Sequence, residues 1–135
     1  MKTDIFFDSN VLLYLTSGEA TKADLAEALI KAGGCVSVQV LNECSSVLRR
    51  KNGLEWPATR EFSEKIRSAC TVFAVTTEIH TKGLFIAERY KYRVHDSMLI
   101  AAALIHGCTT LYSEDMHNGQ IINGLAIRNP FAAAP

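Results

Sequence analysis

The sequence predicts an α/β fold with three layers, in which helices cover both faces of a central, mostly parallel sheet. Short apolar runs alternate with longer stretches of helical periodicity along the 135 residues, and strands separated by helices usually pair in parallel. The chain has no internal repeat, low-complexity segment or linker, apart from a small alanine-rich tail. Residues 1–135 are therefore expected to form a single domain of ordinary size.

The N-terminal half alternates two expected strands with three expected helices. The strands are 3–7 and 35–38, and the helices are 10–17, 20–32 and 39–52. Apolar residues recur at helical spacing through the last of these helices. Gly33 with Gly34 is expected to end the second helix and Gly53 the third, because glycine is favoured just past a helix C-terminus.

The C-terminal half continues the same alternation. The expected strands are 71–75, 108–112 and one near 125–128, and the expected helices are 57–69, 77–90 and 96–106. Pro57 suits the first helical position, Thr77 suits a helix N-cap, and Gly107 suits a helix end. A loop, 113–120, separates the last two strands.

The composition is that of an ordinary globular protein, with 48% hydrophobic and 21% charged residues. The 14 basic and 14 acidic residues give a formal net charge of zero, which alone favours neither a nucleic acid nor a membrane. The basic residues are nevertheless grouped, between Arg49 and Arg67 and between Arg89 and Arg93. No apolar run approaches the ~20 residues that span a bilayer, so we expect no membrane partner and a cytoplasmic location.

Four cysteines lie among apolar neighbours, and no two of them have the spacing of a metal-binding or redox motif. They are Cys35, Cys44, Cys70 and Cys108. We expect buried thiols in a reducing compartment.

Four carboxylates are predicted at one edge of the sheet, where the carboxyl ends of the strands meet and where open α/β sheets form their sites. They are Asp8 after the first strand, Glu43 early in the helix after the second, Asp96 in the first turn of the apolar helix 96–106, and Asp115 after the strand 108–112. Asp4 lies four residues before Asp8, about 13 Å away along an extended strand. It is therefore expected at the opposite edge.

Clustered carboxylates repel one another, at about 4 kcal/mol for two unit charges 4 Å apart in an effective dielectric of 20. Either some of them stay protonated or a cation neutralises them. An all-oxygen ligand set favours Mg²⁺ or Mn²⁺. One or two such ions could activate a water and stabilise the leaving oxygen of a phosphodiester.

Each of these features also has a simpler interpretation. Asp8 could be only a helix N-cap, Asp96 could only complement a helix dipole, and Glu43 and Asp115 could be surface acids. The basic run Arg49, Arg50 and Lys51 could bind RNA phosphates or could be only the solvated end of a helix. The convergence of four acids on one edge favours the functional interpretation.

Four segments carry a family resemblance. "FFDSNVLLY" has an acid followed by Ser and Asn at the end of the first strand, and "VSVQVLNE", "HDSMLIAAAL" and "TLYSEDM" follow in order, each with one of the acids. In these segments the chain resembles PIN-domain nucleases, notably the VapC-like toxins of type II toxin–antitoxin pairs. The resemblance covers nearly the whole chain.

The resemblance implies a PIN-like α/β/α fold and an endoribonuclease that needs Mg²⁺ or Mn²⁺ to cleave RNA. It further implies a toxin that forms a homodimer and is held by a cognate antitoxin protein. By position, the catalytic metal ligands would be Asp8, Glu43, Asp96 and Asp115, supported by Ser9, Asn10 and Ser113. The family often has an aromatic residue after the fourth acid, where this chain reads "MHNGQ". Glu114 also competes with Asp115 for the fourth position.

Three other functions compete with the nuclease. A phosphatase with an aspartyl nucleophile usually has a second acid two residues after the first, but Asn10 stands there. A phospho-receiver domain needs an Asp at the end of its third strand, where this chain has Val75, Thr76 and Thr77. A catalytically silent PIN-like domain that binds RNA or another partner stays the main alternative.

Overall fold

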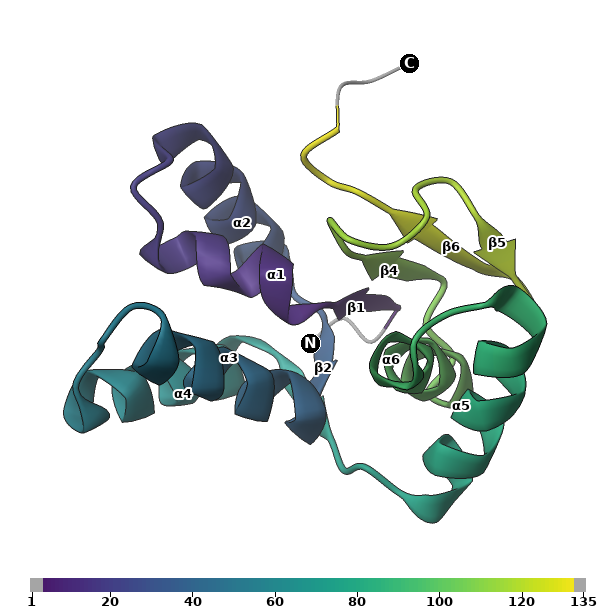
Figure 1. The fold of residues 1–135 in the computed structure, drawn as a ribbon. Coiled ribbons are helices and arrows are strands. Elements are labelled where there is room, and N and C mark those ends of the chain that lie inside the picture. Colours follow the sequence, from purple (N-terminus) through teal and green to yellow (C-terminus); the bar gives the residue numbers. More distant parts are fainter. Residues whose placement is uncertain (1–3, 133–135) are drawn as a thin grey trace.

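The computed structural model describes residues 4–132, which combine a six-stranded sheet with helices (Figure 1). The strands are β1 (Ile5–Phe7), β2 (Cys35–Ser37), β3 (Thr71–Phe73), β4 (Thr110–Tyr112), β5 (Ile121–Ile122) and β6 (Leu125–Arg128). The helices are α1 (Ser9–Leu12), the short 3₁₀ helix η1 (Leu13–Thr16), α2 (Ala20–Ala32), α3 (Val38–Arg50), α4 (Trp56–Ala69), α5 (Thr77–Tyr90) and α6 (Val94–Ile105). The ends of the expected single domain, 1–3 and 133–135, lie outside the described residues.

The strand order in the sheet is β3-β2-β1-β4-β6-β5. Neighbouring strands are parallel, except that β5 runs antiparallel to β6. β1 lies inside the sheet between β2 and β4, and its adjacent residues Phe6 and Phe7 are both fully buried. Successive residues of a strand point to opposite faces, so both faces of β1 are covered. The predicted α/β fold is confirmed.

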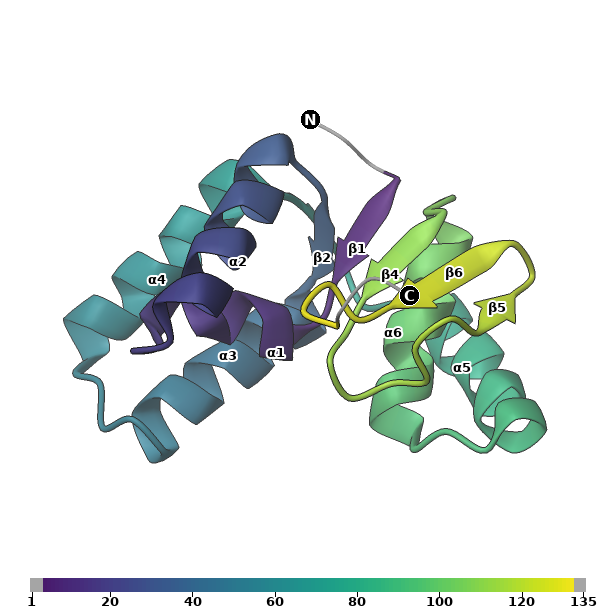
Figure 2. The same cartoon turned by 90° about the horizontal axis from the view of Figure 1, so that it is seen from above.

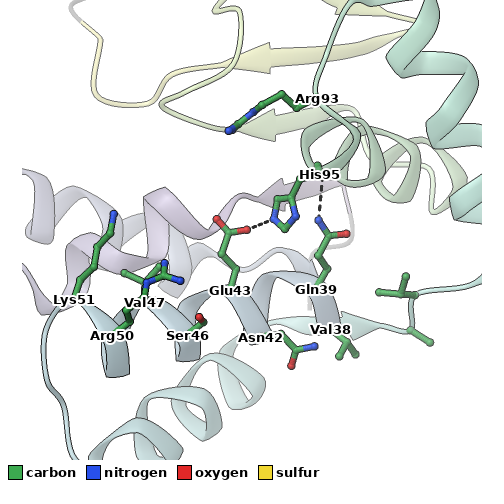
Figure 3. A pocket seen from close by; sticks show the side chains of 12 residues that line it. Val38, Gln39, Asn42, Glu43, Ser46, Val47, Arg50, Lys51, Arg93 and His95 are labelled. Atoms are coloured by element: carbon green, nitrogen blue, oxygen red, sulfur yellow. Dashed lines mark hydrogen bonds and ion pairs between the residues drawn. The ribbon is translucent and has the colours of Figure 1, made fainter.

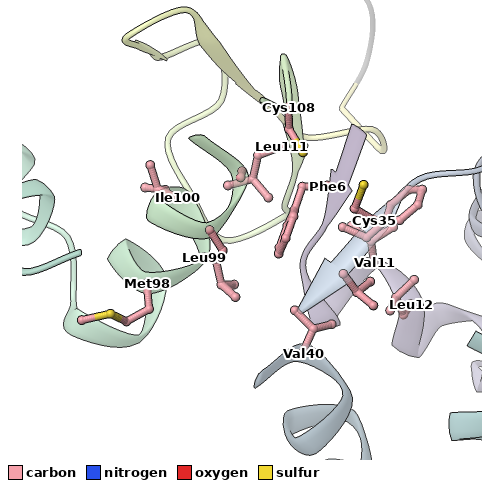
Figure 4. Close-up of a cluster of buried hydrophobic side chains, with 14 of the residues drawn as sticks. Phe6, Val11, Leu12, Cys35, Val40, Met98, Leu99, Ile100, Cys108 and Leu111 are labelled. Carbon is pink, nitrogen blue, oxygen red and sulfur yellow. The ribbon is translucent and has the colours of Figure 1, made fainter. Parts of the chain in front are cut away.

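The helices form two groups, with α1–α4 on one side of the sheet and α5 and α6 on the other (Figures 1 and 2). The hydrophobic core connects them. Figure 4 shows Phe6 of β1 in one buried cluster with Val40 of α3 and with Leu99 and Ile100 of α6. Burying a side chain of this size contributes roughly 1.5–3 kcal/mol, and the cluster therefore fixes both helical layers relative to the sheet.

A hairpin near the C-terminus was not predicted. The loop expected at 113–120 is followed by β5, which turns back into β6 through Asn123 and Gly124. Both turn residues have positive φ, at +49° and +88°, as a tight two-residue hairpin turn requires. Asn-Gly between apolar runs is a strong hairpin signal, so the sequence did contain the information.

The start of the chain differs from the predicted single helix over 10–17, because α1 is followed directly by η1. The predicted N-cap of α5 was wrong by one residue. Thr76, not Thr77, is the cap, and its Oγ1 accepts a hydrogen bond of 3.2 Å from the backbone N–H of Ile79. The other helix boundaries differ from the predictions by no more than two residues, which is within the usual uncertainty of helix ends.

Two further predictions can be compared with the structure. The four cysteines are buried as thiols, as predicted. Among residues 4–132, none of the helices has the length and apolar character needed to cross a membrane.

Candidate active site

The pairing of β1 with β4 brings Asp8 next to Ser113. Phe7 lies opposite Tyr112 in the parallel register, so the residue after each strand falls at the same edge of the sheet. The backbone N–H of Asp8 donates to the carbonyl of Tyr112 at 2.9 Å, and Ser113 Oγ donates to Asp8 Oδ2 at 2.8 Å. We call this edge, where the strands end, the carboxyl edge.

Uncharged donors surround the carboxylate of Asp8, which is only 4% exposed. Its Oδ1 accepts from the backbone N–H of Ser9 at 2.6 Å and from Ser9 Oγ at 3.3 Å. Its Oδ2 accepts from Asn10 Nδ2 at 3.4 Å, in addition to Ser113. Asp8 is also the N-cap of α1. The N-cap interpretation is therefore correct, but it does not explain why the carboxylate is enclosed by further polar groups.

Burial and neighbouring acids change the pKa of Asp8. Burial raises this pKa from 3.8 to about 6, although hydrogen bonds from Ser113 and Ser9 act in the opposite direction. The negative charges of Glu43 and Asp96 raise it further. Asp8 after β1, Glu43 of α3 and Asp96 of α6 therefore share one electrostatic environment.

Two of these acids are each paired with a basic side chain. Glu43 Oε2 contacts His95 Nε2 (Figure 3), and Asp96 Oδ2 lies 3.3 Å from Arg93 Nη2. Asp96 is largely buried in the first turn of α6, as predicted. Gln39 Nε2 donates to the carbonyl of His95 at 3.0 Å and ties the start of α6 to α3.

The fourth predicted acid, Asp115, is exposed. Its neighbour Glu114 is engaged elsewhere, because Glu114 Oε2 lies 2.8 Å from Lys22 Nζ and Glu114 Oε1 accepts from the hydroxyl of Tyr14 at 2.6 Å. The structure therefore commits Glu114 to α2 and η1 and leaves the carboxylate of Asp115 available. Its backbone N–H donates to Ser113 Oγ at 3.3 Å.

Asn10 connects the first acid to the loop that carries the fourth. Its Nδ2 donates to Ser113 Oγ at 3.3 Å as well as to Asp8. Its Oδ1 accepts from the backbone N–H of Glu114 at 3.0 Å. The residues predicted to have supporting roles thus form a single network around Asp8.

A groove of about 920 Å³ opens beside these acids (Figure 3). Glu43 and His95 line it, together with Arg50, Lys51 and Arg93. Of the predicted acids, Glu43 is the one that lines the groove itself, where it lies with several basic side chains.

Arg49, the third member of the predicted RNA-binding run, does not line this groove. Its Nη1 donates to the carbonyl of Leu54 at 2.7 Å, and its guanidinium lies 4.2 Å from the ring centre of Trp56. These contacts hold the connection between α3 and α4. Arg49 therefore differs from Arg50 and Lys51, which both line the groove.

The chemistry of the donors fits a divalent cation, since carboxylate oxygens are the preferred ligands of Mg²⁺ and Mn²⁺. Within residues 4–132, however, no three acidic, histidine or cysteine side chains already converge as a metal site. Glu43 contacts His95 and Asp96 contacts Arg93. The residues that would hold an ion are Asp8, Glu43, Asp96 and Asp115.

A family model described as the PIN domain matches residues 5–117. The chain belongs to the PIN domain family. The resemblance found in the sequence is thereby confirmed, and the match includes all four acids. No curated protein matches this PIN domain at a significant level.

Solved structures of toxins share the fold of this PIN domain. VapC20 of Mycobacterium tuberculosis, described as a sarcin–ricin loop cleaving toxin, has 21% identity and a TM-score of 0.67, over 82% of this chain and 89% of that one. A toxin–antitoxin complex from Klebsiella pneumoniae has 17% identity and a TM-score of 0.72, over 96% and 99%. VapBC2 from Rickettsia felis, bound to a DNA fragment from its promoter, has 14% identity and a TM-score of 0.68, over 93% and 97%.

Several residues that contact the acids of this PIN domain were not among the predicted site residues. Arg93 lies three residues before Asp96, and i,i+3 positions are neighbours on a helix, so that pairing could have been inferred. The contacts of His95 with Glu43 and of Lys22 with Glu114 join elements distant in sequence. No local pattern predicts them.

Proposed function

We propose that this PIN domain is a metal-dependent endoribonuclease that hydrolyses RNA phosphodiester bonds and acts as the toxin of a toxin–antitoxin pair. One observation carries the proposal. Asp8, Glu43 and Asp96, from three separate elements, share one electrostatic environment at the carboxyl edge, beside a groove lined by basic side chains. Acids that bind metal next to cations that bind phosphate are the combination that phosphodiester hydrolysis needs.

In this proposal Asp8, Glu43, Asp96 and Asp115 hold Mg²⁺ or Mn²⁺, which when bound supplies charge neutralisation and an activated water. Ser9, Asn10 and Ser113 keep the Asp8 carboxylate in place through the hydrogen bonds described above. Arg50 and Lys51, which line the groove, bind phosphates of the RNA strand. Their positive charges favour association along the whole backbone, without sequence preference.

The relatives support RNA as the substrate and an antitoxin as the partner. One is described as cleaving the sarcin–ricin loop, another as a toxin–antitoxin complex. A homodimer is implied by the family resemblance and is part of the proposal. We also propose that residues 1–135 act as one domain, because strands from both halves of the described chain share one sheet.

The first test is cleavage of a panel of tRNA, rRNA and mRNA with and without Mg²⁺ or Mn²⁺, followed by mapping of the cut ends. Asp96→Asn keeps the shape of the side chain but removes a metal-neutralising charge, and it is expected to lower cleavage by more than about 1,000-fold. Asp24→Asn, at an exposed position of α2, is the matched control and should cleave normally. Wild-type rates in Asp96→Asn would refute the assignment of the site.

The alternative, a catalytically silent RNA-binding domain, is favoured by one observation. Glu43 already contacts His95 and Asp96 already has the guanidinium of Arg93 as a partner within the chain, so these acids have partners without a metal. This alternative predicts RNA binding without cleavage even at saturating Mn²⁺. Cleavage that depends on Mn²⁺ and is lost in Asp96→Asn would exclude it.

The toxin assignment has its own test. Expression of the wild-type chain alone is expected to slow growth, and Asp8→Asn is expected to relieve this while accumulating to the same level. Harmless expression of a protein that cleaves RNA in vitro would refute the toxin assignment and leave the nuclease assignment intact.

A further inference from the structure

The short segment at the start of α6 supplies both basic partners of the acids. Arg93 lies against Asp96 and His95 against Glu43, whereas the donors to Asp8 are uncharged. The side chain of Arg93 is 78% exposed and that of His95 is 50% exposed. Both side chains line the groove (Figure 3). They are thus in contact with the acids and with the solvent of the groove at the same time.

Helix stability does not explain the position of Arg93. It is the N-cap residue of α6, and its side chain makes no capping hydrogen bond. A positive charge at this position is opposed by the helix dipole, which favours anions at the N-terminus by about 0.3–1 kcal/mol. The positive charge of Arg93 is therefore explained by its surroundings, namely Asp96 and the groove, and not by the stability of α6.

The ion pair itself is weak enough to be exchanged. Asp96 is largely buried, but its partner is mostly in water and reaches it at 3.3 Å, and ion pairs screened by water contribute only about 0–1 kcal/mol because a long side chain must be held in one geometry. A divalent cation coordinated by several carboxylates competes readily with such a pair. When Asp96 turns toward a metal, the guanidinium of Arg93 remains charged and stays at the groove.

Across the groove, the guanidinium of Arg93 lies opposite two other basic side chains. Arg50 and Lys51 lie at the C-terminal end of α3, along one side, and Arg93 comes from the α6 side (Figure 3). A nucleic acid strand in the groove would therefore meet positive charge from both walls. The planar guanidinium suits a phosphate group, which it can bind through two parallel hydrogen bonds.

We propose that Arg93 and His95 are exchangeable partners of the acids. They hold Asp96 and Glu43 in the metal-free protein, and they contact the phosphodiester backbone of RNA once a divalent metal has taken those carboxylates. This inference rests on the proposed function and adds two RNA-contacting residues to it, and it makes RNA binding by Arg93 dependent on metal. A purely structural role for the segment would not produce that dependence.

The test compares Arg93→Gln and His95→Gln with Lys91→Gln, which removes the same charge as Arg93→Gln two residues away at an exposed position. Calorimetry measures Mn²⁺ binding to the RNA-free proteins. Fluorescence anisotropy measures binding of a short phosphorothioate RNA, chosen to slow cleavage, in EDTA and in Mn²⁺ over a range of salt concentrations.

Three results are expected. Arg93→Gln and His95→Gln bind Mn²⁺ about 2- to 5-fold more tightly than Lys91→Gln does, since a competing partner worth up to about 1 kcal/mol is gone. In Mn²⁺, Arg93→Gln binds RNA more weakly, with a salt slope smaller by about 0.7 for one lost phosphate contact. In EDTA, Arg93→Gln binds RNA as Lys91→Gln does.

Two results would overturn the inference. One is Mn²⁺ affinity in both variants equal to that of Lys91→Gln. The other is an equal loss of RNA affinity in EDTA and in Mn²⁺, which would make Arg93 an ordinary phosphate contact. Neither measurement requires turnover. If the variants show the metal-dependent exchange of partners but the wild-type protein does not cleave RNA, only the nuclease proposal is refuted. If the wild-type protein cleaves RNA but the variants show no such exchange, only this inference is refuted.

Discussion

Replacing Asp8 with asparagine is expected to make the metal-free protein more stable at neutral pH and to change its stability much less in acid. The carboxylate of Asp8 is buried and its pKa is raised from 3.8 to about 6. The folded state therefore holds its proton to higher pH than the unfolded chain does. Asparagine has nearly the same shape and never carries this charge.

The sign and size follow from linkage. Below pH 3.8 Asp8 is protonated in both states and contributes nothing to the pH dependence. Between pH 3.8 and 6 the unfolded chain loses its proton first, so stability falls as the pH rises. Above pH 6 the full penalty of about 3 kcal/mol is present, from a shift of about two pKa units at 1.36 kcal/mol each.

The measurement is the free energy of unfolding by urea in EDTA, for wild type and Asp8→Asn, at pH 4.5 and pH 7.5. The penalty is about 1 kcal/mol at the lower pH and about 3 kcal/mol at the higher. The difference between the two proteins should therefore change by about 2 kcal/mol. Asp24→Asn is the control, and its free energy of unfolding relative to wild type should differ between the two pH values by less than about 0.5 kcal/mol. A pH-independent difference for Asp8→Asn would refute a buried, shifted carboxylate at this position.

Two other substitutions test the fold and the groove. Gly34→Ala is expected to lower the free energy of unfolding by about 1–3 kcal/mol, because an added Cβ would lie 2.5 Å from the ring of Phe7 and 2.9 Å from a backbone carbonyl of β1. Gly18→Ala, where a Cβ meets nothing within 4 Å, should be neutral in the same urea titration. Changing Arg50 and Lys51 together to Gln should weaken binding of unrelated RNAs to a similar extent and reduce the salt slope by about 1.4, at about 0.7 per contact. An unchanged slope in a filter-binding assay would show that these side chains are only a solvated helix end.

The sequence predicted the parts of this molecule that depend on local pattern and on strand order. Asp8 and Ser113 could be placed side by side because each directly follows a strand, and parallel strands end at one edge. The position of Asp96 in the first turn of α6 followed from helical periodicity in the same way. Asn123 and Gly124 also carry a local hairpin signal, so β5 is predictable from the sequence by the same kind of local pattern.

The sequence could not predict which partner each long side chain would choose. Glu43 contacts His95, 52 residues away in the chain, and Glu114 contacts Lys22, 92 residues away. Such pairs depend on the packing of several elements at once and leave no periodic trace. For the same reason the predicted basic run could not be divided in advance into Arg49, which holds a turn, and the residues that line the groove.

The energies of the site link metal binding to folding. A ligand that binds only the folded state, at 100 times its dissociation constant, stabilises that state by about 2.7 kcal/mol, which is close to the ~3 kcal/mol that ionised Asp8 costs at pH 7.5. Mn²⁺ at that ratio should therefore offset the penalty in wild type, and the same concentration should stabilise Asp8→Asn by less than half as much, because a neutral amide is a poorer ligand. Thermal unfolding at pH 7.5 with and without Mn²⁺ measures both responses. Equal stabilisation of the two proteins by Mn²⁺ would show that Asp8 is not a metal ligand. Stabilisation of wild type alone would show that the buried charge of Asp8 links metal binding to the stability of the fold.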